Sequence, residues 1–326
     1  MMQPIQGLHH ITALARNPQT NVNFYHNVLG QRLVKTTVNF DDPGTYHFYY
    51  GDKVGTPGSI MTFFPWPMAA RGVRGNGEVG ASAYSIDAGS VDFWRNHLAS
   101  NGVTVGQPET RFGYDVISFE DPDGMALELI VKDGPATYQF WEDGPIPAEH
   151  ALRAFHGVTL WLAEAERTGA LLTEQMGYEL VGQEGNRWRF KGASDDIGLY
   201  VDILVDPKRP AGRMGAGSVH HIAFRTRDDS EQLEYQQQLA QAGLGVTPVR
   251  DRQYFRSIYF RSPGGVLFEI ATDAPGFAID EPVETLGQSL KLPAWYEPRR
   301  REIEAILPPF TIKPVEKVRQ AEVINE

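Results

Sequence analysis

Internal repetition is the feature that most constrains how this 326-residue chain can fold. Residues 7–17 read GLHHITALARN and residues 218–228 read SVHHIAFRTRD, two short apolar runs that carry His-His-Ile in register. Residues 121–130 (DPDGMALELI) and 262–270 (SPGGVLFEI) also match, each with a turn followed by a strand pattern that carries Glu at the same offset. Repeats of this kind indicate one supersecondary unit that is used several times.

These anchors divide the chain into four units, which begin near residues 7, 79, 155 and 219. Each unit has a strand pattern, then a helix pattern, then three strand patterns. The first helix is expected between Asn17, a candidate N-cap, and Gly30, a C-terminal stop. The repeat therefore predicts an α+β fold of four βαβββ modules. Helices are expected at 17–30, 90–102, 165–177 and 228–243, and the expected strands include 103–107 and 246–250.

The segment between the second and third units is expected to be a linker. Residues 132–150 contain two Gly-Pro turns and little periodicity. We therefore expect one domain over residues 1–146 and a second over 147–280, followed by a tail over 281–326.

The tail has a single helix pattern, which Pro308 and Pro309 end. It is expected to pack on the body through Trp295, Tyr296 and Phe310. Its Arg299–Arg301 cluster is interpreted as a solvated helix face.

Charge and cysteine content exclude several classes of protein. The formal net charge is −11, which argues against binding to nucleic acid or to an anionic membrane surface. The chain has no cysteine, so disulfides, thiolate zinc sites, iron–sulfur clusters and a cysteine nucleophile are excluded. A metal must therefore bind to His, Asp or Glu. No apolar run reaches the roughly 18 residues of a membrane span, and the N-terminus has no signal-peptide pattern, so the cytoplasm is the expected compartment.

The two His-His pairs are the first candidates for chemistry. Because a strand alternates its faces, His9 and His10 are expected to point in opposite directions, as are His220 and His221. A single pair is typical of one core and one surface histidine. Two pairs at equivalent repeat positions instead favour a site at which one histidine from each unit converges.

Glu269 is the third candidate, because it lies in an otherwise apolar strand pattern. A buried carboxylate is costly unless it has a partner, and a metal ion would supply one. Two His and one carboxylate form the facial triad of non-haem Fe(II) enzymes, although the same set could hold catalytic zinc.

The other units act as internal controls. Unit two carries Glu128 but has Gly80 and Ala81 in place of the His pair, and unit three has His156 followed by Gly157. Only units one and four together supply two His and a Glu, which favours a single shared site. We expect Glu128 to be structural and His156 to be a core residue or a neighbour of the site. The remaining histidines are expected to be surface or packing residues: His26, His47, His97 and His150.

Other catalytic motifs are missing or out of context. The chain has no G-x-S-x-G, no P-loop and no H-E-x-x-H motif. Gly75, Gly77 and Gly80 fit G-x-G-x-x-G, but the run precedes a strand pattern, so a dinucleotide site is not expected.

Arg252 and Tyr259 flank a strand pattern. They are either an exposed Arg and a core Tyr, or a buried pair that orients a phenolate and moves protons near a metal.

Several segments resemble a known family. GLHHITALARN, NFYHNVLGQRLVKTTVNFDDPGTYHFYYGD, SVHHIAFR, DRQYFRSIYFRSPGGVLFEIATDAPGF and LKLPAWYEPRRREIEAILP are similar to the vicinal oxygen chelate superfamily, which includes glyoxalases, bleomycin resistance proteins and dioxygenases. The similarity is strongest to the dioxygenases that open para-hydroquinone rings, and it covers nearly the whole chain. It implies four βαβββ modules in two tandem glyoxalase-like domains with an Fe(II) centre.

The resemblance also implies roles for individual residues. It implies His10, His221 and Glu269 as the metal ligands, whereas catechol-type enzymes take their His ligands from modules three and four, where Gly157 stands here. Around the ligands it implies a set of catalytic residues: His9, Thr12, His220, Arg252 and Tyr259.

The function implied is an Fe(II)-dependent dioxygenase that inserts both atoms of O₂ into a hydroquinone-like aromatic diol. Its expected partners are the small aromatic substrate and O₂, with no nucleic acid and no membrane. Other divalent metals could replace Fe(II). The alternatives are a catechol-type extradiol dioxygenase, a glyoxalase-type isomerase or lyase with Zn(II) or Ni(II), and a non-catalytic protein that binds an aromatic ligand. The sequence leaves a homo-oligomer open.

Overall fold

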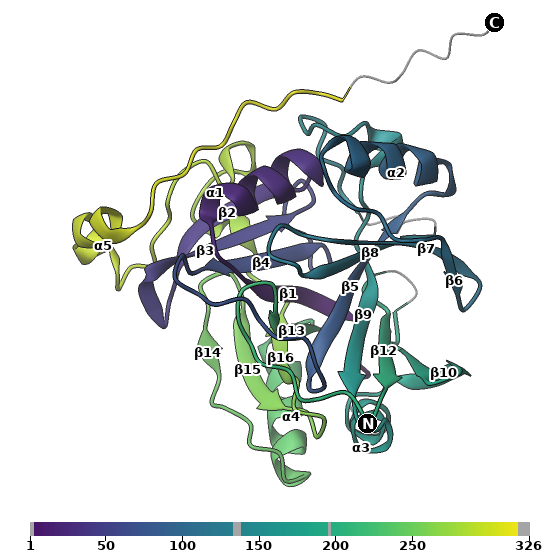
Figure 1. Ribbon diagram of the computed structural model, residues 1–326. Helices are drawn as coiled ribbons and strands as arrows, with labels where there is room; N and C mark the ends of the chain where they lie inside the picture. The colour runs from purple at the N-terminus through teal and green to yellow at the C-terminus, as the bar shows by residue number, and fades with distance from the viewer. Residues whose placement is uncertain (1–2, 133–137, 195–196, 319–326) are drawn as a thin grey trace, which may run out of the picture.

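The computed structural model describes residues 3–132, 138–194 and 197–318, and it contains two eight-stranded sheets (Figure 1). The first sheet has the strand order β14-β15-β16-β13-β1-β4-β3-β2, and the second has the order β10-β11-β12-β9-β5-β8-β7-β6. Module one is therefore joined to module four, and module two to module three. The predicted α+β architecture of four βαβββ modules is confirmed, and each sheet combines modules from both halves of the sequence.

The strands of the first sheet come from the two ends of the chain. They are β1 (Leu8–Ala15), β2 (Arg32–Asn39), β3 (Asp42–Gly51), β4 (Ile60–Pro65), β13 (Val219–Thr226), β14 (Arg250–Asp251), β15 (Arg256–Arg261) and β16 (Leu267–Thr272). The strands of the second sheet come from the middle of the chain. They are β5 (Glu78–Ile86), β6 (Glu109–Arg111), β7 (Tyr114–Glu120), β8 (Ala126–Val131), β9 (Phe155–Leu162), β10 (Glu179–Glu184), β11 (Arg187–Lys191) and β12 (Tyr200–Val205).

All four predicted module helices form. They are α1 (Pro18–Val22), α2 (Val91–Ser100), α3 (Glu166–Ala170) and α4 (Asp229–Gln241). The first and third continue as π-helical turns, Asn23–Val28 and Leu171–Gln175. Asn17 caps the first helix as predicted, because its side chain accepts from the backbone N–H of Thr20. Gly30 follows this helix with φ of 69°, a conformation that favours glycine.

Two predicted strands are wrong. Residues 103–107 contribute only an isolated bridge from Val105 to Phe119, and the strand forms later, at β6. Of residues 246–250, only Arg250 belongs to a strand, β14. Pro248 lies in the middle of that segment and has no N–H to donate to a sheet ladder. The linker prediction falls partly on residues 133–137, which lie outside the described residues.

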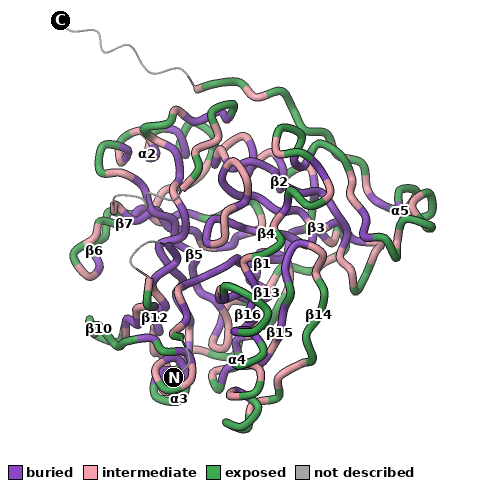
Figure 2. Tube along the Cα trace, turned by 180° about the vertical axis from the view of Figure 1, so that it is seen from behind, coloured by how far each residue is buried: buried purple, intermediate pink, exposed green. Residues whose placement is uncertain are grey.

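The strands at the centre of each sheet are buried along almost their whole length (Figure 2). All eight residues of β1 are buried, and it pairs antiparallel with β13 and parallel with β4. Apolar burial of these strands supplies most of the favourable free energy of folding. None of the helices within the described ranges is long and apolar enough to cross a bilayer.

Bulges interrupt the central ladders at equivalent positions in all four modules. His9 on β1 and His220 on β13 are skipped in the pairing of these strands. Gly80 and His156 are skipped in the same way between β5 and β9. A β-bulge adds one residue to a strand and changes the direction of its side chains. The two rings of each pair lie in contact, with Nδ1–Nδ1 distances of 2.9 Å for His9–His10 and 2.7 Å for His220–His221, so the expectation that they point in opposite directions is wrong.

The tail packs along the first sheet, as the sequence predicts. The ring of Phe310 lies 5.2 Å from that of Tyr46, and Trp295 contacts Phe40 edge to face. The tail contains helix α5 (Arg300–Ile306). The ion pairs of Arg299 and Arg300 join them to glutamates on the same exposed segment, which confirms a solvated face.

Candidate metal centre

Three side chains that the sequence analysis selected meet on adjacent strands of the first sheet. His10 comes from β1, His221 from β13 and Glu269 from β16. Nε2 of His221 lies 2.9 Å from Oε2 of Glu269 and 3.3 Å from Nε2 of His10, and the His10–Glu269 distance is 3.4 Å. All three are buried, with exposures of 2%, 5% and 0% for His10, His221 and Glu269. One ligand atom from each lies within 4.8 Å of the others.

His9 determines which nitrogen of His10 carries the proton. Nε2 of His9 lies 3.1 Å from the carbonyl oxygen of Thr272, which can only accept, so His9 must donate from Nε2. Burial, followed by the nearby His10, lowers the pKa of His9 well below its usual value, so its ring is neutral. Nδ1 of His9 is then an acceptor for Nδ1–H of His10, 2.9 Å away. This leaves a lone pair on Nε2 of His10, as a metal ligand requires.

The second pair repeats this arrangement with one difference. Nδ1 of His220 lies 2.7 Å from Nδ1 of His221. Burial, followed by His221, lowers the pKa of His220 to about 3, so this ring is also neutral. Unlike His9, His220 lines the cavity in front of the three residues. When its Nδ1 accepts from His221, the remaining proton of His220 is on Nε2.

The chemistry of the donor set fits a cation. Two imidazole lone pairs and a carboxylate oxygen converge, and within the described residues Oε2 of Glu269 has no hydrogen-bond partner of suitable geometry. Oε1 of the same carboxylate accepts from Ser257 Oγ at 2.5 Å. Burial alone would raise the pKa of Glu269, but the charge and hydrogen bonds that His10 and His221 offer when protonated hold it well below its usual range, and a cation can take the place of those protons. Two neutral His and one carboxylate suit Fe(II) and other borderline divalent ions.

A cavity of about 200 Å³ opens beside the three residues, and His10 and His221 line it. Aromatic rings form much of its wall, among them Phe40, Phe64 and Trp66. Pockets for drug-sized molecules span roughly 300–1,000 Å³, so this cavity suits a ligand with a single ring.

Arg252 and Tyr259 both line the cavity, so Arg252 is not simply an exposed side chain. Nε of Arg252 donates to the hydroxyl oxygen of Tyr259 at 3.1 Å, and Nη2 donates to Asp41 at 2.9 Å. Burial and the nearby Glu269 raise the pKa of Tyr259, so the hydroxyl keeps its proton. The ring of Tyr259 contacts the ring of His221 edge to face.

His47 packs against the rings of Tyr49 and Phe64, as expected of a packing residue, but it also lines the cavity, which the sequence analysis did not predict. Its Nε2 lies 2.9 Å from Thr62 Oγ1, and its Nδ1 lies 2.8 Å from the hydroxyl of Tyr49. Thr62 in turn donates to Thr12 at 2.8 Å. The sequence indicates only that His47 lies in a strand pattern. The repeats give no further signal, because the other units have no matching histidine at this position.

In the second sheet, arginine side chains bind the carboxylates at the equivalent positions. Arg111 donates two hydrogen bonds to Glu128, at 2.7 and 3.1 Å, and Arg189 donates two to Asp202. A Cβ on Gly157 would lie 2.2 Å from a backbone oxygen, so no histidine fits there. Glu128 is therefore structural, as expected. His156 is a buried residue that packs against the rings of Tyr114 and Tyr200.

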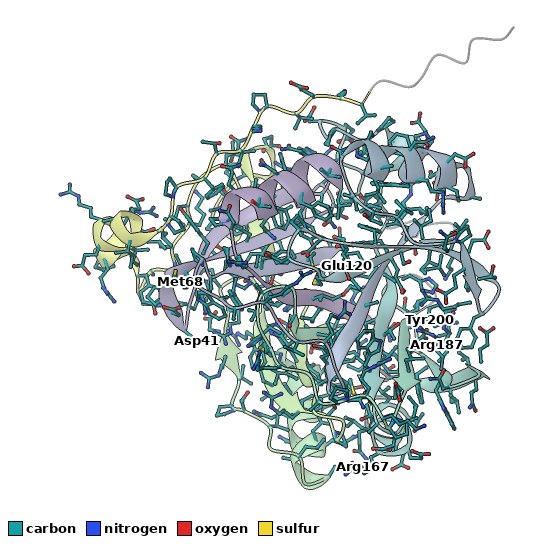
Figure 3. The ribbon with its side chains drawn as sticks, in the orientation of Figure 1. Asp41, Met68, Glu120, Arg167, Arg187 and Tyr200 are labelled. Atoms are coloured by element: carbon teal, nitrogen blue, oxygen red, sulfur yellow. The ribbon has the colours of Figure 1, made fainter. Side chains whose placement is uncertain are left out.

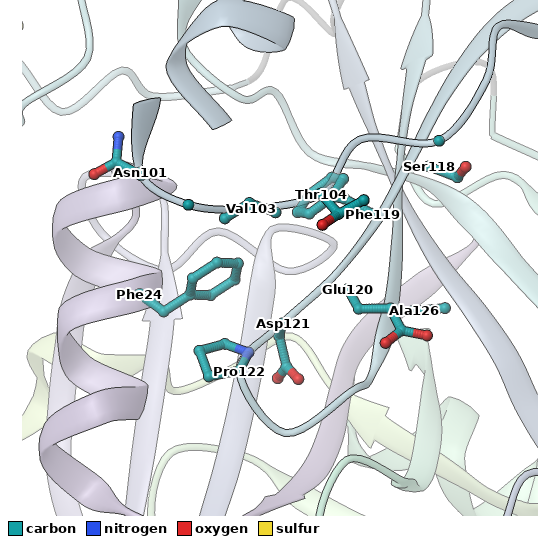
Figure 4. Close-up of a pocket in the computed structure, with 12 residues that line it drawn as sticks. Phe24, Asn101, Val103, Thr104, Ser118, Phe119, Glu120, Asp121, Pro122 and Ala126 are labelled. Carbon is teal, nitrogen blue, oxygen red and sulfur yellow. The ribbon is translucent and has the colours of Figure 1, made fainter. Parts of the chain in front are cut away.

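A larger hollow of about 640 Å³ is lined by none of these three residues (Figure 4). It lies between Phe24 and the end of β7, and no histidine lines it. Its one buried carboxylate, Asp121, already accepts from the Tyr25 hydroxyl at 3.0 Å and from the N–H of Met125 at 2.8 Å. This hollow therefore offers no comparable chemistry.

Comparisons with known proteins show the family to which the chain belongs. The model of the Glyoxalase/Bleomycin resistance protein/Dioxygenase superfamily matches residues 7–129 and 148–270. A Bacillus subtilis (strain 168) protein named "Putative ring-cleaving dioxygenase MhqO" is 48% identical over 96% of this chain and 99% of its own length. A chlorohydroquinone/hydroquinone 1,2-dioxygenase from Sphingobium indicum is 36% identical over 88% of this chain and 91% of its own.

Solved structures share the fold of this chain. A crystal structure of a "putative dioxygenase" from Bacillus subtilis superposes with a TM-score of 0.90 at 47% identity, covering 96% of this chain and all of its own. Glyoxalase I from Zea mays is 14% identical with a TM-score of 0.62, over 82% of this chain and 92% of its own, a likeness of fold alone.

Proposed function

Because this chain belongs to the glyoxalase/bleomycin resistance protein/dioxygenase superfamily and is an enzyme of the ring-cleaving dioxygenase type, we propose that it uses Fe(II) and O₂ to open the ring of a hydroquinone-like diol. The observation that carries the proposal is the convergence of His10, His221 and Glu269 beside a cavity of single-ring size. In this proposal residues 1–146 supply the first ligand and residues 147–280 supply the other two, while residues 281–326 form the tail.

The three ligands would hold Fe(II), which supplies coordination sites for a phenolate oxygen and O₂ and a route for electrons between them. The two oxygens of a para-diol lie on opposite sides of its ring, so only one can approach the ligands. A catechol could approach with both. The use of histidines from modules one and four, rather than three and four, favours the para-diol.

Arg252 and Tyr259 orient the substrate, and Tyr259 carries a proton beside it. Because the hydroxyl oxygen of Tyr259 accepts from Arg252, the hydroxyl hydrogen of Tyr259 is free to be donated to a substrate oxygen. When His221 binds the metal through Nε2 and donates from Nδ1 to His220, the proton of His220 is on Nε2, at the cavity wall. A group that holds a proton at a reacting oxygen can act as general acid or base.

His9 and Thr12 act from outside the cavity wall. His9 fixes the tautomer of His10, and Thr12 belongs to the hydrogen-bonded chain that runs through Thr62 to His47. Outer partners of this kind orient metal ligands and raise their basicity.

Oxygen uptake tests the proposal. Metal-free protein is reconstituted anaerobically with Fe(II) and offered hydroquinone, methylhydroquinone and catechol separately. Stoichiometric uptake is expected with the para-diols, and His10→Ala should abolish it and release the iron. Uptake with catechol alone would assign the chain to the extradiol class. No uptake despite bound Fe(II) would favour an oxygen-independent isomerase or lyase.

A further inference from the structure

The C-terminal tail, which lies outside the four modules, reaches the wall of the cavity. The hydroxyl of Tyr296 donates to the backbone oxygen of Phe40 at 2.8 Å, and the ring of Trp295 contacts the ring of Phe40 edge to face. Phe40 lines the cavity. Figure 1 shows the tail and α5 beside strands β2 and β3, whose connecting turn contains Phe40 and Asp41.

This turn joins module one to module four across the cavity. The N–H of Asp41 donates to the side-chain oxygen of Asn39 at 3.0 Å, which shapes the turn. The carboxylate of Asp41 accepts from Arg252 at 2.9 Å, and Arg252 in turn donates to Tyr259. Figure 3 labels Asp41 near the β14 edge of the first sheet, next to which Arg252 lies in sequence. The turn thus supplies one of the two side chains that hold the guanidinium of Arg252, and Tyr259 supplies the other.

The ion pair alone is a weak anchor for the turn. The side chain of Asp41 is 61% exposed, and exposed ion pairs are screened by water and salt. The tail supplies a second anchor for the turn, because the tail is itself held against β2. The N–H of Lys291 donates to the backbone oxygen of Thr36 at 2.9 Å. Gly287 lies so close to β2 that a Cβ would stand 1.8 Å from the oxygen of Leu33.

We propose that Tyr296 is a positioning residue for the substrate cavity, because it holds the β2–β3 turn so that Phe40 forms one wall and Asp41 keeps Arg252 against Tyr259. Only the oxygen-uptake part of the test rests on the proposed function. The effect on the turn itself does not.

Tyr296→Phe in the full-length, Fe(II)-loaded protein is the test, because it removes one hydroxyl and keeps the ring. Tyr235→Phe is the matched control, since the hydroxyl of Tyr235 on α4 also donates to a backbone oxygen, that of Gln3, at 2.7 Å. Hydrogen exchange reports opening of the turn at Phe40 and Asp41. Oxygen uptake with hydroquinone gives KM and kcat separately.

Tyr296→Phe should raise KM by up to about 10-fold, because one hydrogen bond changes the equilibrium between the seated and unseated turn by about 2- to 10-fold, and apparent affinity scales with the seated fraction. The value of kcat should change less than about twofold, because the reacting groups are intact once the turn is seated. Exchange at the turn should become faster, and Tyr235→Phe should change neither quantity. Asp41→Asn should also raise KM, and the double variant should raise it by less than the product of the two, because both act on one turn.

Unchanged exchange at the turn and unchanged KM in a folded Tyr296→Phe protein would overturn the proposal. So would equal effects in Tyr235→Phe, or a fall in kcat alone. If wild-type protein consumes no O₂ with any diol, the proposed function fails, and the exchange comparison still decides the role of Tyr296.

Discussion

Metal binding should stabilise this protein, and a single carboxylate should control the effect. A ligand that binds only the native state adds about 2.7 kcal/mol of stability when its concentration is about 100 times Kd. Unfolding entropy is about 2.1 cal/mol/K per residue, or roughly 0.7 kcal/mol/K for 326 residues. Dividing the two values predicts that Fe(II) raises Tm by about 4 °C.

Glu269→Gln should remove most of this increase. The substitution keeps the size of a fully buried side chain and removes the negative charge that a divalent ion needs beside two neutral histidines. We expect the metal-dependent rise in Tm to fall below about 1 °C at the same Fe(II) concentration, because the site is then far from saturation.

Glu128→Gln is the matched control, since Glu128 occupies the equivalent strand position in the second sheet. It accepts two hydrogen bonds from the buried Arg111, and removing one partner of a buried pair costs about 3 kcal/mol. This variant should therefore lower Tm of the metal-free protein by about 4 °C and retain the full metal-dependent increase.

Scanning calorimetry under anaerobic conditions, with Fe(II) or with a chelator, measures both quantities. An unchanged Tm of the wild type at saturating Fe(II), or an undiminished increase in Glu269→Gln, would contradict this prediction. Loss of the increase in Glu128→Gln would contradict it as well, because the second sheet would then take part in binding.

Three further predictions concern single side chains. His9→Phe should weaken Fe(II) binding about 10- to 100-fold in a chelator competition, because His10 loses the acceptor that fixes its tautomer; unchanged affinity would contradict this role. Arg252→Lys should lower kcat/KM in the oxygen-uptake assay by about tenfold or more, since an ammonium lacks the planar fork that reaches both Tyr259 and Asp41; full activity would refute it. Burial raises the pKa of Asp121 to about 6, above its unfolded value of about 3.9. Its contribution to stability is therefore present below about pH 4 and lost as pH rises through about 6, so urea unfolding should show a loss over this window that Asp121→Asn lacks.

The local patterns of the sequence predict most of the fold. The strand and helix periods recur in the same order in each unit, and the caps of the first helix form at Asn17 and Gly30. The predictions fail where the pattern is short or interrupted, as at Pro248. Local propensity suffices for long elements because alternating apolar residues must bury one face wherever the chain packs.

The sequence also selects the three converging residues, because only the first and last units together carry two histidines and a glutamate. This comparison among repeats needs no coordinates. It identifies Glu128 as structural for the same reason, since its unit has Gly80 and Ala81 where histidines would be required.

Tertiary structure alone decides how these residues act. The bulges at His9 and His220 depend on pairing between β1 and β13, strands more than 200 residues apart in the chain, and they bring adjacent imidazoles into hydrogen-bond contact. The place of His47 in the cavity depends on the neighbouring strand that carries Thr62. The contact of Tyr296 with Phe40 depends on where the tail settles. The period of a sequence pattern determines which residues lie on one face of a helix or strand. Contacts between distant elements depend instead on how those faces pack against one another, and no local pattern encodes that packing.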